Sequence, residues 1–307
     1  AAVVIFAGIL KPEATQTKKC SLIYIPKIRD NTNDFWTSVI SGCKMAAEEY
    51  ESDLEILAPD KEENIEEQNK LLKKAIEQKP DAILFSPSSM DASDELLKEA
   101  KEKGIRITYI DSYTKEELQD LTVATDNVNA GRMLGEYARK LIDKDSKIAI
   151  VSHVKGVSTA VEREQGFTEG LGDYADNIVD IVYCNSLYEK SYELAQELMR
   201  KYPELIAGMN EYSAVGVGRA VSDAGAKDKI AVVGVDCSQE AINLMEMGVY
   251  KGIIVQKAFR MGYIGVEETI HMLNGDAVEK NIDSGCELVT PENMYNSDIE
   301  RLIFPFS

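Results

Sequence analysis

Cysteine, histidine and tryptophan are scarce in this sequence, and their scarcity excludes several kinds of site. The 307 residues include five cysteines, two histidines and one tryptophan. The cysteines are widely spaced without a CxxC pair, which excludes a zinc ribbon and a thioredoxin-type motif, and their odd number argues against a disulfide-built scaffold. The chain has only two histidines, His153 and His271, which are too few to favour a histidine-based zinc site or a catalytic triad.

The motifs of common enzymes are missing as well. No GxGxxG follows the first predicted strand, and the chain has neither a GxxxxGK[ST] phosphate loop nor a GxSxG nucleophile elbow. His271 is expected on a helix surface, whereas His153 ends a predicted strand, a position from which it could line a cleft. The sequence therefore predicts a protein that is not an enzyme, with no metal and no cofactor.

Basic residues are in deficit: 34 Lys and Arg stand against 53 Asp and Glu, which gives a net charge of −19. Binding to nucleic acid needs a basic face, so nucleic acid is not an expected partner. The composition is that of a soluble globular protein, and the length predicts two domains of about 150 residues each.

The first ten residues are apolar or small, and the polar stretch 11–19 follows them. Ten helical residues reach about 15 Å, roughly half of a bilayer core, so this piece cannot span a membrane alone. We interpret it as the end of a signal sequence or of an uncleaved membrane anchor, which places the protein outside the cytoplasm. A short buried strand or an expression remnant is the alternative, and a cleavage site near residues 13–15 stays open.

Apolar runs of strand length alternate with amphipathic helical stretches, which is typical of a parallel α/β sheet. Strands are expected at 21–26, 54–58, 82–86, 105–110 and 122–124, and again at 147–152, 178–183, 205–209, 230–235 and 251–255. Helices are expected at 35–50, 65–78, 92–103, 160–171, 192–201, 214–224, 239–247 and 261–273.

Two successive runs of five βα units are too many for one compact doubly wound sheet, so we expect two lobes. Each lobe is a doubly wound parallel sheet flanked by helices, and a short crossing near Thr125 and Asp126 joins them. The helix and strand segments after Gln256 are expected to cross back between the lobes, so that each lobe is assembled from discontinuous parts of the sequence. The predicted division is 1–19 for the apolar segment and tether, 20–125 plus 257–285 for the N-terminal lobe, and 126–256 plus 286–307 for the C-terminal lobe.

Polar side chains follow the predicted strands, at the sheet edge where parallel α/β proteins bind ligands. They are Asn33 with the adjacent Phe35 and Trp36, Asp111 with Ser112, Asp126 with Asn127, and then Arg163, Asn210, Asp236 and Gln256. Planar carboxylate, amide and guanidinium groups can bind neighbouring sugar hydroxyls in pairs, and an aromatic ring packs on the C–H face of a sugar. Trp36 as a core residue and Asn33 as a helix N-cap remain the alternatives.

Several motifs make the chain resemble the ribose/galactose/xylose-type periplasmic sugar-binding proteins, which share a superfamily with the effector cores of lactose-repressor-like regulators. The resemblance spans residues 21–293 and rests on NTNDFW (31–36), IDS (110–112), ATDNVNAG (124–131), VEREQGF (161–167), MNEYSAVGVGRAV (209–221), VVGVDCS (232–238) and IIVQK (253–257). It implies the two-lobe type I periplasmic binding protein fold and a monosaccharide ligand.

Carried over position by position, the resemblance implies a ligand pocket of Asn33, Phe35, Trp36, Asp111, Arg163, Asn210, Asp236 and Gln256. Asp126 and Asn127 match the hinge region, and Leu187 or Tyr188 is the expected aromatic position of the second lobe. Ribose binders have arginine directly after the aspartate, where this chain has Ser112. Ribose itself is therefore in doubt, and a pentose such as xylose is preferred.

The implied mechanism is closure of two lobes around the sugar, which the ligand favours by binding both lobes. The apolar N-terminus and the missing lipid-attachment motif favour signalling of closure to a membrane sensor kinase. In this respect the chain resembles the membrane-anchored clostridial xylose sensors that pair with a LytS-type histidine kinase. The alternative is the substrate-binding component of a sugar ABC transporter, with a membrane permease as partner. A repressor effector core is less favoured, because no helix-turn-helix precedes the first strand.

Overall fold

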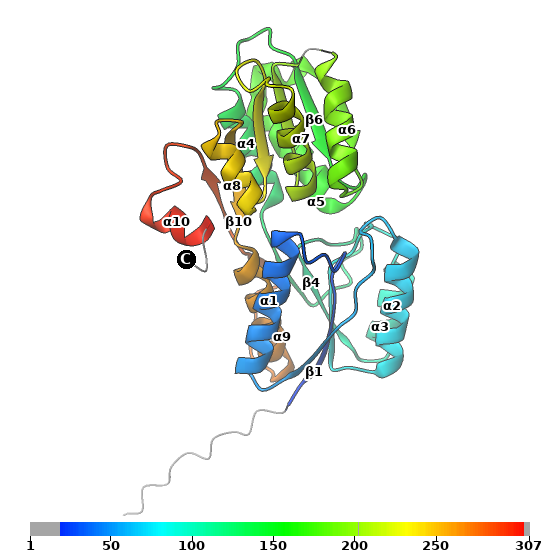
Figure 1. The fold of residues 1–307 in the computed structure, drawn as a ribbon. Coiled ribbons are helices and arrows are strands. Elements are labelled where there is room, and N and C mark those ends of the chain that lie inside the picture. The colour runs from blue at the N-terminus through cyan, green and yellow to red at the C-terminus, as the bar shows by residue number, and fades with distance from the viewer. Residues whose placement is uncertain (1–18, 202, 304–307) are drawn as a thin grey trace, which may run out of the picture.

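The computed structural model describes residues 19–201 and 203–303, so the predicted N-terminal anchor lies outside the described residues. Two lobes lie one above the other and are connected by a narrow region of extended chain (Figure 1). Each lobe has one sheet of six strands with helices on both faces. This confirms the predicted fold class, a two-lobe periplasmic binding protein fold with mostly parallel sheets.

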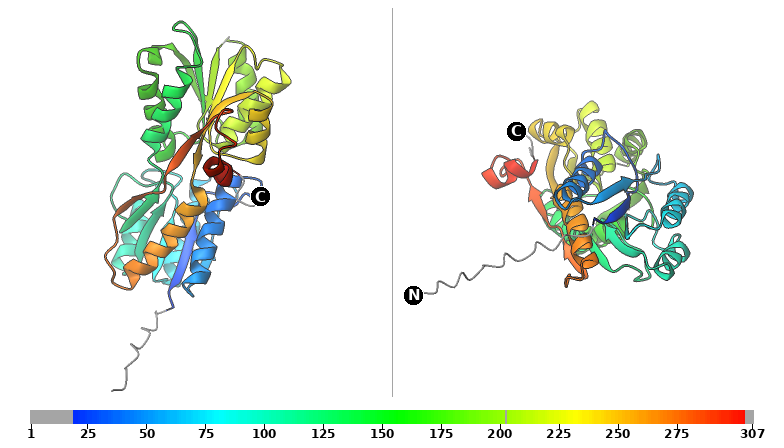
Figure 2. Two further views of the ribbon diagram at one scale, coloured as in Figure 1. Left: turned by 90° about the vertical axis from the view of Figure 1, so that its left-hand side faces the viewer. Right: turned by 90° about the horizontal axis from the view of Figure 1, so that it is seen from below.

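In the N-terminal lobe the strand order is β11-β5-β4-β3-β1-β2, and neighbouring strands are parallel. The strands are β1 (Ser21–Ile25), β2 (Asp53–Ile56), β3 (Ala82–Phe85), β4 (Arg106–Ile110), β5 (Leu121–Ala124) and β11 (Asn281–Asp283). The helices are α1 (Asp34–Glu49), α2 (Ile65–Gln78), α3 (Asp94–Glu102) and α9 (Ala258–Leu273). Helices α1 and α9 pack side by side against one face of the sheet (Figure 2).

In the C-terminal lobe the order is β12-β10-β9-β8-β6-β7, with β12 antiparallel to β10 and the other pairs parallel. The strands are β6 (Ile148–Ser152), β7 (Ile178–Tyr183), β8 (Leu205–Gly208), β9 (Ala231–Val235), β10 (Tyr250–Gln256) and β12 (Cys286–Val289). The helices are α4 (Asn127–Ala138), α5 (Ser158–Leu171), the 3-10 helix Gly172–Asn177, α6 (Tyr188–Met199), α7 (Glu211–Asp223), α8 (Gln239–Glu246) and α10 (Ser297–Ile303).

The chain passes between the lobes after β5, after β10 and after β11. These three crossings are bonded to one another: the Ser284 amide donates to the Ala124 carbonyl at 2.9 Å, and the Thr125 and Ser284 hydroxyls lie 3.2 Å apart. The Lys257 amide donates to the Gly285 carbonyl at 3.1 Å. All three crossings are short and bonded together, so they form one connection at the position of the predicted hinge.

Helix α4 is the main element that the hydrophobic pattern does not predict. Its two glycines, Gly131 and Gly135, reduce its apolar periodicity, but they let α4 approach α5 closely. A Cβ atom at Gly131 would lie 2.3 Å from the Arg163 carbonyl oxygen, and one at Gly166 would lie 2.0 Å from the Val128 carbonyl oxygen. This close backbone contact holds the helix that carries Arg163 in place.

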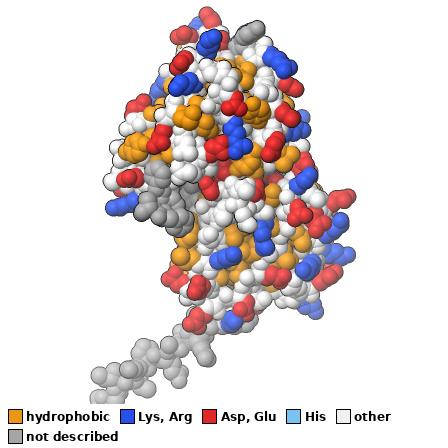
Figure 3. Space-filling model, in the orientation of Figure 1, with side chains coloured by type: hydrophobic (Ala, Val, Ile, Leu, Met, Phe, Trp, Pro, Cys, Tyr) orange, Lys and Arg blue, Asp and Glu red, His pale blue; other side chains and the backbone are white. Residues whose placement is uncertain are grey.

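Acidic and basic side chains are interspersed over both lobes on the face shown in Figure 3. Among the described residues, no helix is both long enough and apolar enough to cross a membrane.

The α4–α5 contact gives a first prediction. Replacing Gly166 with Ala should lower the free energy of unfolding by about 1–3 kcal/mol, because the new methyl group clashes with backbone atoms of α4. A backbone atom, unlike a side chain, cannot change rotamer to relieve the clash. Chemical denaturation measures the change. The control is Gly104→Asn, at a left-handed position with no atom within 4 Å of an added Cβ, which should change stability much less. Equal effects of both substitutions would contradict the close-packing argument.

Candidate functional site

A cavity lies between the lobes, where the carboxyl ends of both sheets face each other. Its lining from the N-terminal lobe is Lys27, Asn33, Phe35, Trp36, Glu62 and Asp111. Its lining from the C-terminal lobe is His153, Thr159, Arg163, Asn210, Glu211, Tyr212, Asp236 and Gln256. All eight residues that the resemblance implies for the pocket therefore line one cavity.

The other predicted positions lie around the cavity and are not part of its lining. Asn127 accepts a hydrogen bond from Arg163 Nε at 2.8 Å, and Asp126 caps the N-terminus of α4 at the hinge. Ser112 is buried and donates to the Pro87 carbonyl at 3.0 Å. Tyr188 begins α6, where its hydroxyl donates to Glu211 at 2.7 Å, and Leu187 is the N-cap of that helix.

Asp111 and Asp236 occupy equivalent places in the two lobes, each directly after a central strand. Both have left-handed backbone conformations, with φ of 72° and 75°. Non-glycine residues rarely adopt this conformation, and it is concentrated at functional sites. It points each carboxylate into the cleft, where 3% of Asp111 and 4% of Asp236 is exposed.

Asn33 serves both as a helix cap and as part of the cavity lining. Its side-chain oxygen accepts from the Trp36 amide at 2.9 Å and so caps α1. The same turn fixes the Phe35 and Trp36 rings in an edge-to-face pair with centroids 5.1 Å apart. Because the cap uses the Asn33 oxygen, its amide NH₂ group is the part that binds other partners, and the Tyr188 hydroxyl is one of them.

In the C-terminal lobe, buried contacts orient Arg163 and Asp236. Arg163 donates through Nη1 to the Met209 carbonyl at 2.8 Å, in addition to its bond to Asn127. Asp236 accepts from Gln256 Nε2 at 2.6 Å and from the Glu211 amide at 3.1 Å. Burial raises the pKa of Asp236, and the nearby Arg163 opposes this effect.

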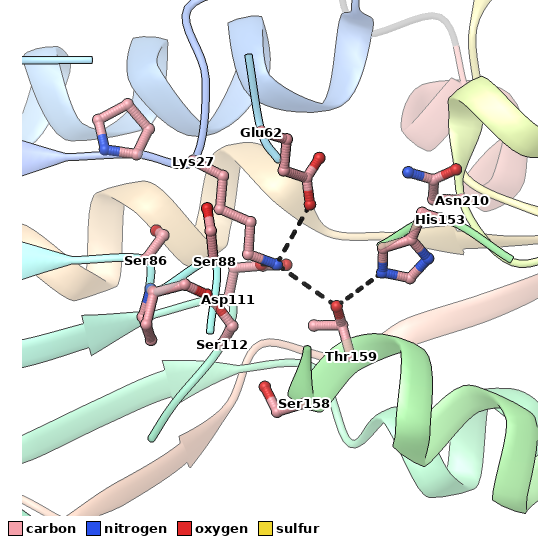
Figure 4. A network of polar contacts seen from close by, with 12 residues as sticks. Lys27, Glu62, Ser86, Ser88, Asp111, Ser112, His153, Ser158, Thr159 and Asn210 are labelled. Carbon is pink, nitrogen blue, oxygen red and sulfur yellow. Dashed lines mark hydrogen bonds and ion pairs between the residues drawn. The ribbon is translucent and has the colours of Figure 1, made fainter. Parts of the chain in front are cut away.

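Six lining residues are absent from the predicted pocket: Lys27, Glu62, His153, Thr159, Glu211 and Tyr212. His153 follows β6 and lines the cavity, as its place at the end of a predicted strand allows. Lys27 follows β1, so the strand-end rule could have found it. Figure 4 shows the Lys27 side chain between Glu62, Asp111 and Thr159. Lys27 Nζ lies 2.8 Å from Asp111 Oδ2 and 3.8 Å from Glu62 Oε1. A cation therefore does accompany Asp111, and it comes from the loop after β1 rather than from the position of Ser112.

Hydrogen bonds between the lobes close the cleft on two sides. On one side, Glu211 accepts from the Asp34 and Phe35 amides at 3.2 and 3.1 Å, and Asp34 in turn accepts from the Gln239 amide at 3.2 Å. Each lobe thus supplies a side-chain carboxyl group that accepts from a helix N-terminus of the other lobe. On the other side, the Tyr113 hydroxyl donates to Glu162.

Burial raises the pKa of Glu211 to about 8, even though the Tyr188 hydroxyl and two amides donate to it. Because this pKa lies above the ordinary value of 4.5, the folded protein keeps a proton that the unfolded chain loses. The contribution of this proton to the free energy of unfolding is fully present below pH 4.5, and it is lost as the pH rises through 8.

We expect the free energy of unfolding to fall between pH 5 and 8 with a slope of up to about 1.4 kcal/mol per pH unit from this one proton. Glu211→Gln should remove that part of the slope, and denaturant titrations at several pH values measure it. The exposed Glu193→Gln should leave the slope unchanged. A slope that is the same in the wild type and in Glu211→Gln would contradict the prediction.

Comparison with known proteins gives one family match: the family model described as periplasmic binding protein domain matches residues 24–277. The ribose import binding protein of Bacillus subtilis is 24% identical over 282 residues, covering 91% of this chain and 90% of that protein. The ribose import binding protein of Escherichia coli is 27% identical over 213 residues, covering 68% of this chain and 71% of that protein.

Two solved structures are similar over most of the chain. A sugar transporter from Clostridium phytofermentans is 41% identical with a TM-score of 0.84, covering 89% of this chain and 99% of that one. A carbohydrate transporter solute-binding protein from Agrobacterium radiobacter, in complex with D-arabinose, is 26% identical with a TM-score of 0.87, covering 93% of this chain and 99% of that one.

Proposed function

Because the chain belongs to the periplasmic binding protein domain family, we propose that it binds a monosaccharide between its lobes and delivers it to the permease of an ABC transporter. The observation that carries this proposal is the cavity itself: carboxylate, amide, guanidinium and aromatic groups from both lobes surround one space. Such groups match the alternating hydroxyl and C–H surfaces of a sugar. In this role the protein is a binding protein that performs no chemistry on its ligand.

The relatives support transport more than signalling. The two curated relatives are named as ribose import binding proteins, and the two structures as transporter proteins. A role as a sensor for a membrane-bound histidine kinase, which the sequence favours, has no such support among them. The transport role places the protein outside the cytoplasmic membrane. Neighbouring genes for a permease and an ATPase would support it, and a neighbouring kinase gene would support the sensor role.

A pentose is the ligand that we favour, because two of the relatives above are named for ribose and a third holds D-arabinose. The ligand would contact Asp111 from the N-terminal lobe and Arg163 and Asp236 from the C-terminal lobe. Binding both lobes at once stabilises the closed arrangement, since a ligand shifts an equilibrium toward the state that it contacts better.

The single tryptophan allows a direct test of sugar binding. Trp36 lines the cavity with only 4% of its surface exposed, so an adjacent sugar should change its fluorescence. We expect titration with xylose, ribose, arabinose, glucose and galactose to give a saturable change with at least one sugar, together with a higher melting temperature. If no sugar changes either signal, the proposed function is wrong.

The contribution of the C-terminal lobe is tested by Asp236→Ala. This substitution should weaken binding by at least about 10-fold, because it removes a buried carboxylate that accepts hydrogen bonds. The matched control is Asp145→Ala, at an exposed position outside the cavity lining, which should bind like the wild type. Equal sugar affinities of the two variants would show that Asp236 does not contribute to ligand binding.

A further inference from the structure

A chain of three polar side chains crosses the cleft inside the cavity (Figure 4). Lys27 of the N-terminal lobe donates to Thr159 Oγ1 at 3.4 Å, and the same oxygen lies 2.9 Å from His153 Nε2. Lys27 is 2% exposed, and its ammonium also lies 5.9 Å from the centre of the Trp36 ring. A buried ammonium is costly unless it is paired, and Lys27 is paired with Asp111 at the boundary between the lobes.

The ammonium fixes the direction of the first hydrogen bond in this chain. An ammonium can only donate, so Thr159 accepts from Lys27. The hydroxyl hydrogen of Thr159 can then be donated to His153 Nε2. Burial, with Arg163 and Lys27 nearby, lowers the pKa of His153 well below 6.5, so the ring is neutral and holds one proton. In the arrangement in which Thr159 donates to Nε2, that proton lies on Nδ1.

The Nδ1 atom of His153 is buried, and it has no hydrogen-bond partner among the residues that the structure describes. The ring itself lines the cavity. A buried N–H group without a partner loses its bond to water and gains nothing in return. Gln256 Oε1, which lines the same cavity, is another buried atom without a partner. Both atoms have hydrogen-bonding capacity left for a ligand.

We propose that Lys27 and His153 are specificity-determining residues that select the ligand by the positions of two of its oxygen atoms. Lys27 donates to one hydroxyl oxygen, and the hydrogen of that hydroxyl is donated to Asp111. His153 donates from Nδ1 to a second ligand oxygen, with Thr159 holding the ring in the required tautomer. This inference rests on the proposed sugar-binding function and extends it to the choice between stereoisomers.

Two substitutions of His153 separate its two nitrogens. The amide nitrogen of Asn can take roughly the place of His Nδ1, so His153→Asn keeps a donor for the ligand. Gln extends toward the place of Nε2, so His153→Gln keeps the contact with Thr159 and loses that donor. We expect His153→Gln to weaken sugar binding about 5-fold or more, the effect of one neutral hydrogen bond, and His153→Asn to change it less. Equal losses, or none in either variant, would overturn the role of Nδ1.

Lys27 is tested with the best-binding sugar and its monodeoxy analogues. Lys27→Met should weaken binding of the parent sugar by about 10-fold or more, as expected for a charged hydrogen bond. For the analogue that lacks the contacted hydroxyl, the same substitution should cost much less. An equal loss for the parent sugar and every analogue would overturn the inference, because a merely structural lysine would affect all ligands alike.

Removing Lys27 leaves Asp111 and Glu62 without their cation, which could prevent folding. The double variant Lys27→Met with Glu62→Gln removes one charge of each sign, and the sugar comparison is repeated with it. Lys27→Arg keeps the charge but changes its shape, so it should alter the order of preference among epimeric sugars. An unchanged order in both variants counts against the inference.

Failure of this inference is distinguishable from failure of the proposed function. If the wild type binds no sugar, the proposed function is wrong. If the wild type binds a sugar and the Lys27 and His153 variants show the same preferences as the wild type, only the specificity role is wrong.

Discussion

Buried charge in the cleft is the constraint on which the arrangement of the two lobes depends. The carboxyl ends of two parallel sheets face each other, so the charged side chains at these ends lose contact with water. Burial of a charge is tolerated only when it is paired and hydrogen-bonded. Lys27 accompanies Asp111 in one lobe, and Arg163 lies near Asp236 in the other. Each lobe thus provides acceptors and donors in the same small space.

Contacts between the lobes follow from the same constraint. Glu211 connects three parts of the site: its carboxylate binds the first turn of α1, its amide binds Asp236, and Tyr188 donates to it. The turn that it binds carries Phe35 and Trp36, which line the cavity. A change in the position of either lobe therefore affects both the aromatic rings and the Asp236 carboxylate of the site. The three crossings between the lobes are bonded to one another as well.

The elements could be predicted where hydrophobic periodicity is strong, as in the buried strands β1 and β3 and in the amphipathic helix α2. Helix α4 could not be predicted in this way, because its glycines serve contact with α5, which becomes visible only when both helices are packed. The short strands β11 and β12 are partly exposed, and their three and four residues are too few to give a strand pattern of their own. Their pairing with the sheet edges defines them as strands.

The sequence by itself determined the alternation of strands and helices, and hence which polar residues follow a strand. Since parallel strands end at one edge of a sheet, Asp111 and Asp236 could be assigned to a common cleft. Only the tertiary structure decided which other groups reach that cleft. Lys27, Thr159 and His153 come from different elements in two lobes, and their contacts depend on how the lobes close. Local periodicity carries no information about distances across a cleft, so these partners become visible only in three dimensions.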